Sequence, residues 1–325
     1  MRTLITGATG FLGQNLCEWL VREGATARAL VRSPEKAQAL RALGVEIVPG
    51  DVTDDAAVAR ALEDVDVVFN LAGKLYIPGV PAADYQHIHV VGTEVVLRRA
   101  RERGVTRFVH CSTTGVFGVT GDSAVDEDAP YAPTNAYERT KLEGERLVRA
   151  AIEEGFPAVI IRPGLVYGPG DLHLVGLFRS VQRGLFRPIG HTPVRLHPIF
   201  IDDLNDAMLR AARSERALGE AFNIAGREPA TLSDLAYAIA KSLNVAPPRG
   251  WIPSPLAQAV ARMGDALPPT LRQHAPLTSS RLDFLTHSRV YVVGKAQRLL
   301  DFTAETPLAD GIAKTAAWYQ ARGLL

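Results

Sequence analysis

Tyr137 and Lys141 stand four residues apart in the sequence NAYERTKLEGE, residues 135–145. An α-helix turns once in about 3.6 residues, so a helix here would carry both side chains on one face. A free tyrosine has a pKa of about 10, which is too high for a base near neutral pH. A neighbouring ammonium group stabilises the phenolate and lowers that pKa. The pair therefore predicts a proton-transfer site, with Tyr137 as the general acid or base and Lys141 as the group that tunes it.

A second chemical signal lies at the start of the chain, in LITGATGFLGQNL. Here Gly7, Gly10 and Gly13 separate a strand-like run from an amphipathic helical pattern. A tight turn needs a residue that tolerates positive φ, and a pyrophosphate needs close approach to main-chain N–H groups at a helix N-terminus. The position between a strand and a helix predicts a dinucleotide-binding turn.

The first half of the chain contains the elements that would position these residues. Strand-like runs at 2–6, 26–32, 45–51, 66–72, 107–113 and 158–164 alternate with helical patterns at 11–24, 33–44, 55–64, 85–104 and 135–155. This alternation predicts an α/β protein, a doubly wound Rossmann fold whose parallel sheet is covered on both faces. Glycine, which adopts the left-handed conformation at a helix end without strain, follows several of these helices.

After residue 168 the alternation weakens. We expect residues 1–168 to form the dinucleotide-binding domain, with 197–226 returning to it, and 169–325 to form a smaller, mostly helical substrate-binding domain. A helix over 231–244 begins at a capping threonine. Between 251 and 269, one apolar stripe contains Leu256, Val260, Met263 and Leu267. Either a hydrophobic lid over the substrate or ordinary core packing would explain that stripe.

The composition narrows the functional classes. The 325 residues carry a formal net charge of +1, which gives no indication of nucleic acid or of an anionic membrane surface as a partner. Since no run of about 18 apolar residues occurs, we expect no membrane-spanning helix. The two cysteines and the lack of a leader pattern predict a cytoplasmic protein. His87 and His89 are too isolated to indicate a metal site, so none is expected.

Seven motifs follow one another along nearly the whole chain: TGATGFLG, GDVTD, NLAG, CSTTGVFG, YERTK, RPGLVYGPGD and FNIAG. In this combination the chain resembles the extended short-chain dehydrogenase/reductase superfamily, which includes the NAD-dependent epimerases and dehydratases and the dihydroflavonol-reductase-like and 3β-hydroxysteroid-dehydrogenase-like enzymes. The resemblance implies hydride transfer between a nicotinamide cofactor and a small-molecule secondary alcohol or ketone. It implies that Lys141 also binds the nicotinamide ribose, and that Thr113 is the third catalytic residue, with Ser112 as the alternative.

The same resemblance assigns cofactor contacts by position. They are Gly7, Thr9, Gly10, Phe11, Leu12 and Gly13 in the glycine-rich turn, Asp51 and Val52 after the third strand, Asn70, Leu71, Ala72 and Gly73 after the fourth, Pro163, Gly164 and Val166 after the sixth, and Tyr137 with Lys141. One position departs from the family pattern, because His89 stands where the family often has an asparagine of the active site. It could form hydrogen bonds in place of that asparagine, or it could be a packed helix residue.

The second strand ends in Val31, Arg32 and Ser33. An NAD enzyme of this type needs a carboxylate at this strand end to accept hydrogen bonds from the adenosine ribose. The resemblance places the aspartate of NAD-using relatives at Val31. The guanidinium of Arg32 matches a phosphate dianion instead, and the Ser33 hydroxyl adds a donor. We therefore expect NADP as the preferred cofactor and NAD as the second choice.

Three alternatives to a reductase, namely a dehydratase, an epimerase and a non-catalytic sensor, each require particular residues. A dehydratase of this family has Asp-Glu after the catalytic threonine, whereas Thr113 is followed by Thr114 and Gly115. A nucleotide-sugar epimerase with tightly bound NAD needs cations for a pyrophosphate, and the candidates are Arg179, Arg183, Arg187 and Arg195. A non-catalytic NADP-binding sensor would lose the tyrosine or the lysine.

The resemblance also predicts a homodimer. The helices expected at 85–103 and 136–154 resemble the pair that forms a four-helix interface in this family. Val91, Val95 and Leu142 are the candidate contacts on a two-fold axis.

Overall fold

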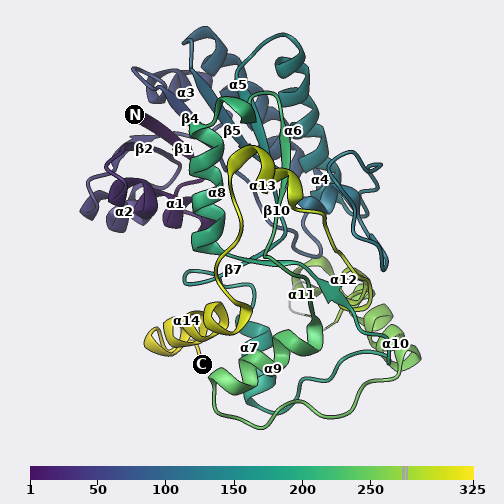
Figure 1. Cartoon of the computed structure of the whole chain (residues 1–325). Helices are drawn as coiled ribbons and strands as arrows, with labels where there is room; N and C mark the ends of the chain where they lie inside the picture. The colour runs from purple at the N-terminus through teal and green to yellow at the C-terminus, as the bar shows by residue number, and fades with distance from the viewer. Residues whose placement is uncertain (273–274, 276) are drawn as a thin grey trace.

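The computed structural model describes residues 1–272, 275 and 277–325 (Figure 1). At its centre is a seven-stranded parallel sheet with the strand order β10-β6-β5-β4-β1-β2-β3. The strands are β1 (Arg2–Thr6), β2 (Thr26–Val31), β3 (Glu46–Pro49), β4 (Val67–Asn70), β5 (Arg107–Cys111), β6 (Ala158–Pro163) and β10 (Ala221–Ile224). The order reverses between β1 and β4, and ligands of open α/β sheets bind at such a switch point.

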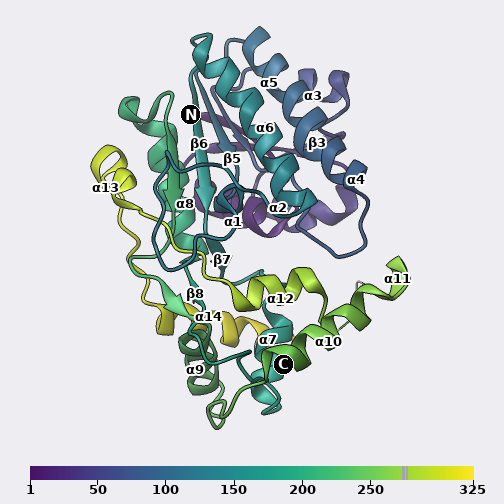
Figure 2. The same ribbon diagram turned by 90° about the vertical axis from the view of Figure 1, so that its right-hand side faces the viewer.

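Helices cover both faces of the sheet, as Figures 1 and 2 show. α1 (Phe11–Arg22) and α8 (Ile201–Arg213) pack on one face, and α3 (Asp55–Ala61), α5 (Gly92–Glu102) and α6 (Ala136–Glu153) pack on the other. Consecutive strand residues point to opposite faces. Ile5 and Leu4 accordingly lie in two separate hydrophobic clusters, one on each side of the sheet. The expected doubly wound fold is confirmed.

Two of the expected helices differ from the sequence pattern. The one expected at 33–44 is a 3₁₀ turn (Pro34–Ala37) followed by the short α2 (Gln38–Ala42). The one expected at 85–104 consists of α4 (Ala82–Gln86), a π-helical turn (His87–Val91) and α5. A π-helical turn is rare and often marks a functional site.

The rest of the chain is mostly helical and lies below the carboxyl edge of the sheet in Figure 1. It contains α7 (Val175–Gln182), α9 (Leu232–Ser242), α10 (Ser254–Asp265), α11 (Pro269–Arg272), α12 (Ser279–Thr286) and α14 (Leu308–Ala321). Two small sheets join it to the main sheet: β7 (Leu165–Tyr167) with β9 (Pro198–Phe200), and β8 (Arg195–Leu196) with β11 (Ala230–Thr231). α13 (Gly294–Leu300) returns to pack against β10.

Local signals account for several helix ends in this structure. Thr231 caps α9, and its hydroxyl and the carboxylate of Asp234 exchange hydrogen bonds with each other's main-chain N–H groups in a capping box. Gly24, which follows α1, has a positive φ of 75°, as a helix-ending glycine should. In the described part of the chain, no helix combines the length and the apolar composition needed to cross a membrane.

Candidate active site

The glycine-rich turn between β1 and α1 can hold a pyrophosphate. Gly7 has a φ of +68°, and a Cβ there would lie 2.8 Å from the main-chain oxygen of Leu71. A Cβ on Gly13 would lie 2.3 Å from the oxygen of Gly7, so this glycine lets α1 pack against the turn. Because α1 begins at Phe11, its N-terminal N–H groups and the positive end of its dipole face the turn. The turn fits the dinucleotide that the sequence predicts.

The other predicted cofactor contacts follow strands at the same edge of the sheet. Arg32 follows β2, Asp51 follows β3, Gly73 follows β4 and Gly164 follows β6. Since all these strands are parallel, their carboxyl ends lie together beside the glycine-rich turn. The topology therefore brings residues more than 150 positions apart to one edge.

Thr6 fixes the turn after β4, a role that was not predicted from the sequence. Its hydroxyl accepts hydrogen bonds from the N–H groups of Leu71 and Ala72, each at 3.1 Å, and donates to Asn70 Oδ1 at 2.8 Å. A threonine directly before a glycine-rich turn is the signal that could have indicated it.

A cavity of about 570 Å³ lies beside Arg32 and the loop after β4. It is lined by Arg32, Gly73, Lys74, Ala83, Asp84, His87 and Ile88. The side chain of Arg32 is 69% exposed, and its Nε lies 3.6 Å from Asp51 Oδ2. An exposed ion pair of this kind is weak, so the guanidinium can turn to an anionic ligand at low cost.

Tyr137 and Lys141 lie on α6, which Asn135 caps by accepting a hydrogen bond from Glu138 N at 3.0 Å. The Thr113 side chain acts on the phenol of Tyr137, whose pKa it lowers, and it accepts a hydrogen bond from Gly115 N at 3.0 Å. The neighbouring hydroxyls are both buried. Ser112 Oγ has no hydrogen-bond partner among the described residues, although it helps to lower the pKa of Glu145, while Thr114 donates to the Pro163 carbonyl at 3.0 Å. The geometry thus favours Thr113 over Ser112 as the partner of Tyr137.

Burial, and not Lys141, has the largest effect on the pKa of Tyr137. It raises that pKa well above its usual value of 10, and the Thr113 side chain offsets only part of the rise. Lys141 is itself buried, and its Nζ donates a hydrogen bond to the Cys111 carbonyl. Helical spacing placed both residues on one face, but burial and a main-chain acceptor decide the charge distribution there.

His89 lies in the π-helical turn and contacts both the loop after β4 and α6. Its Nε2 accepts a hydrogen bond from Lys74 N at 3.0 Å, and its Nδ1 lies 2.8 Å from Thr140 Oγ1. The imidazole is edge-on to the Tyr137 ring, with 5.5 Å between ring centroids. His89 is therefore both hydrogen-bonded and packed, since only 1% of it is exposed.

A buried ion pair supports the helix that carries Tyr137. Glu145, one turn beyond Lys141, forms an ion pair of 2.6 Å with Arg162 of β6, and neither side chain is exposed to solvent. Arg162 also donates to the Glu127 carbonyl at 3.0 Å and to the Tyr131 hydroxyl at 2.8 Å. The guanidinium lowers the pKa of Glu145 to about 2, despite the opposing effect of burial. Sequence reasoning missed this pair, because its partners belong to different elements.

Two further expectations concern the surface and metals. Leu142 is buried against Val116, Phe117 and Tyr291, so the prediction that it forms a subunit contact is wrong. Val91 is 38% exposed and remains available for such a contact.

In the described residues, no group of three or more side chains is arranged to bind a metal ion.

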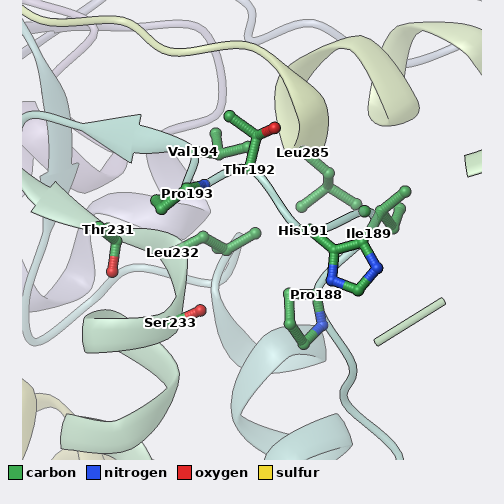
Figure 3. A pocket seen from close by; sticks show the side chains of 11 residues that line it. Pro188, Ile189, His191, Thr192, Pro193, Val194, Thr231, Leu232, Ser233 and Leu285 are labelled. Carbon is green, nitrogen blue, oxygen red and sulfur yellow. The ribbon is translucent and has the colours of Figure 1, made fainter. Parts of the chain in front are cut away.

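A second cavity, of about 170 Å³, lies in the C-terminal part (Figure 3). It is surrounded by residues 188–194, by the start of α9 (Leu232 and Ser233) with its cap Thr231, and by Leu285 of α12. None of the candidate catalytic residues lines this cavity, so it is separate from the proton-transfer site.

Comparison with known proteins finds a matching enzyme family and similar reductases. Residues 3–225 match the NAD dependent epimerase/dehydratase family. A 4-hydroxy-2-methyl-3-oxo-4-farnesyl-3,4-dihydroquinoline-1-oxide ketoreductase of Stigmatella aurantiaca is 31% identical over 312 residues, which cover 95% of this chain and 91% of that protein. A 2-alkyl-3-oxoalkanoate reductase of Stenotrophomonas maltophilia is 29% identical, over 98% of this chain and 99% of that protein.

Among solved structures, a UDP-glucuronic acid 4-epimerase from Bacillus cereus, in complex with UDP-glucuronic acid and NAD, has a similar fold. Its TM-score is 0.79 at 22% identity, with 99% of this chain and all of that chain covered.

Proposed function

Since this chain belongs to the NAD-dependent epimerase/dehydratase family, and is therefore an enzyme of the extended short-chain dehydrogenase/reductase type, we propose that it reduces a lipophilic ketone to a secondary alcohol. The observation that carries the proposal is the placement of Thr113, directly after β5, and Tyr137, on α6, at the carboxyl edge of the sheet, where the Thr113 side chain acts on the phenol. This is the edge at which the glycine-rich turn lies.

A reduced nicotinamide held there would supply the hydride for the carbonyl carbon of the substrate. Tyr137 would give its hydroxyl proton to the carbonyl oxygen, while the Thr113 hydroxyl donates a hydrogen bond to the same oxygen. The raised pKa of Tyr137 keeps the phenol protonated at neutral pH, which is the form that reduction requires. The phenolate left after the transfer would regain its proton from solvent.

Two neighbouring activities are less well supported. A dehydratase would need further carboxylates after Thr113, and Thr114 and Gly115 occupy those positions. An epimerase would need free cations for a nucleotide pyrophosphate. Arg179 donates to the Leu324 carbonyl and Arg187 to the carbonyls of Gly184 and Phe186, so two of the four candidate arginines contact the chain's own backbone. The other two, Arg183 and Arg195, are exposed and form no ion pair with a described residue.

The names of two relatives support the lipophilic class. Both are reductases of ketones, and their substrates carry a farnesyl group in one case and an alkyl chain in the other. With a cation at the end of β2, NADPH is the proposed hydride donor.

The test is a panel of alkyl ketones, prenylated ketones and steroid ketones, with NADPH consumption followed by absorbance. We expect turnover with at least one class. Tyr137→Phe removes a single hydroxyl and should lower turnover by about 10²–10⁴-fold with cofactor affinity unchanged. Tyr237→Phe, at an exposed tyrosine of α9, is the matched control. Near-normal turnover in Tyr137→Phe would refute the role of this residue, and activity on nucleotide sugars alone would favour an epimerase.

A further inference from the structure

α10 has an unusual distribution of side chains. Met263 is 72% exposed and Leu256 is 57% exposed, and Val260 between them is exposed as well. These three residues follow the i, i+4, i+7 spacing, so they form one outward stripe. The interpretation that the sequence stripe is core packing is therefore wrong.

The opposite face of the same helix is built from small residues. Ala257, Ala261 and Gly264 are buried, and α10 packs with this face toward α12. At Gly264 a Cβ would lie only 2.0 Å from the Leu277 carbonyl oxygen, so the contact is close. A helix that only needed to complete the core would bury its large apolar side chains and expose its small ones. α10 does the reverse, which indicates that its large side chains have a partner outside the chain.

α10 and α11 project from the lower part of the molecule (Figure 2). The charges around them are mostly positive, since residues 249–289 contain five arginines and only two acidic residues. Both acidic groups have partners: Asp265 accepts from Ser279 N, and Asp283 pairs with Arg289 at 2.6 Å. Arg249 and Arg262 are exposed, and neither forms an ion pair with a described residue. The small net charge of the whole chain conceals this local excess.

We propose that α10 docks on the surface of an anionic lipid bilayer. An interfacial helix inserts an apolar face among the lipids while arginines beside that face contact the headgroups. Leu256, Val260 and Met263 would form the inserted face, and Arg262 would lie at its border. Trp251, just before α10, is also exposed, and tryptophan is favoured at the membrane interface.

The charges favour a bilayer over a second copy of this chain. A two-fold contact through the stripe would bring the same arginines of two subunits together, and like charges repel. An anionic headgroup layer would instead attract all of them. The docking would not require a membrane-spanning helix.

Contacts extend from this surface toward the candidate active site. α12 lies against α10 and carries Ser280, whose hydroxyl is 2.8 Å from the Tyr76 hydroxyl. Tyr76 stacks on Tyr85 at 6.5 Å, and the ring of Tyr85 lies 6.5 Å from that of Tyr137. A substrate dissolved in the bilayer would thus meet a docked enzyme on the side from which these contacts lead to Tyr137. The docking itself does not depend on the proposed reaction.

The test is co-sedimentation of the purified full-length protein with vesicles. One set contains phosphatidylcholine alone, and the other contains phosphatidylcholine mixed with phosphatidylglycerol. We expect binding to the mixed vesicles that weakens as salt is added. The double variant Leu256→Glu/Met263→Glu should bind at least ~10-fold more weakly, because it places two carboxylates in the inserted face. Arg262→Glu should reduce the dependence on phosphatidylglycerol.

The matched control is Leu43→Glu, which changes an exposed leucine next to α2 and should leave binding unchanged. Circular dichroism and retained cofactor binding would show that each variant is folded. The proposal is overturned if the unaltered protein binds neither vesicle type, or if the double variant binds as tightly as the unaltered protein. A dimer in light scattering that the double variant dissociates would assign the stripe to a second copy instead.

Discussion

His89 Nδ1 lies 2.8 Å from Thr140 Oγ1, and this contact ties the loop after β4 to the helix that carries Tyr137 and Lys141. The Thr140 hydroxyl donates to the Ala136 carbonyl at 2.9 Å, so toward His89 it acts as an acceptor. Since Nε2 accepts from Lys74 N, the proton of the ring must sit on Nδ1. These contacts require a neutral imidazole, because a doubly protonated ring could not accept from Lys74.

This requirement predicts a loss of stability in mild acid. Burial, with a smaller contribution from Lys141, lowers the pKa of His89 from 6.5 to about 3, and burial lowers that of His110 to about 3 as well. Between these values the unfolded chain binds protons that the folded protein does not, so the free energy of unfolding falls as pH drops below 6.5. From about pH 7 to about pH 5, each histidine contributes a loss of about 2 kcal/mol.

Substitution of His89 separates its contribution to the pH dependence of stability from that of His110. Asparagine keeps a donor and an acceptor but does not titrate, so His89→Asn should lose less stability between the two pH values. Urea unfolding measures the difference. Gln86→Asn, an exposed substitution on the neighbouring α4 that changes no titrating group, should retain the full pH dependence. An unchanged slope in His89→Asn would show that the imidazole is not held neutral.

Arg32 should decide the preference between the two dinucleotides. We expect the unaltered protein to bind NADP at least ~10-fold more tightly than NAD, about the value of one charge-assisted contact. Arg32→Ala should remove most of that difference and leave NAD affinity nearly unchanged. Calorimetric dissociation constants for both nucleotides provide the measurement. Lys36→Ala, which removes an exposed positive charge from the following 3₁₀ turn, is the control. Tighter binding of NAD by the unaltered protein would contradict the assignment.

Removal of only one partner of the ion pair between Arg162 and Glu145 should strongly destabilise the folded protein. Arg162→Met leaves an uncompensated buried carboxylate and should lower the free energy of unfolding by about 3–5 kcal/mol. The double variant Arg162→Met/Glu145→Met should recover much of this loss, because it removes both charges. Arg149→Met removes a partly exposed partner of Glu145 and should cost about 1 kcal/mol or less. Equal losses in Arg162→Met and Arg149→Met would mean that burial of the pair is unimportant.

The predicted homodimer now rests on Val91 and Val95. Val91 is exposed on the π-helical turn and Val95 is partly buried on α5. We expect a dimer at micromolar concentration by light scattering, and Val91→Asp should shift it toward monomer, since a two-fold contact would bury the introduced carboxylate twice. Val292→Asp, at an exposed valine elsewhere, should leave the dimer intact. A monomeric unaltered protein would refute the prediction.

The sequence by itself determined the features that depend on spacing along the chain. The interval between Tyr137 and Lys141 fixes their common helix face, whatever surrounds the helix. The glycines of the first turn are required by local backbone geometry, because Gly7 has a positive φ. Alternating strands and helices likewise determine the doubly wound sheet, since their apolar patterns allow few other arrangements.

Only the tertiary structure decided which side chains meet and which remain outside. Ser112 and Thr113 are adjacent hydroxyls in the sequence, but Thr113 is partly exposed and acts on the phenol of Tyr137, whereas Ser112 is buried. Leu142 is buried, whereas Met263 of an equally apolar pattern is exposed. The reason is that periodicity determines the face of a helix on which a residue lies, while the elements packed against that face determine its burial, its partners and its pKa.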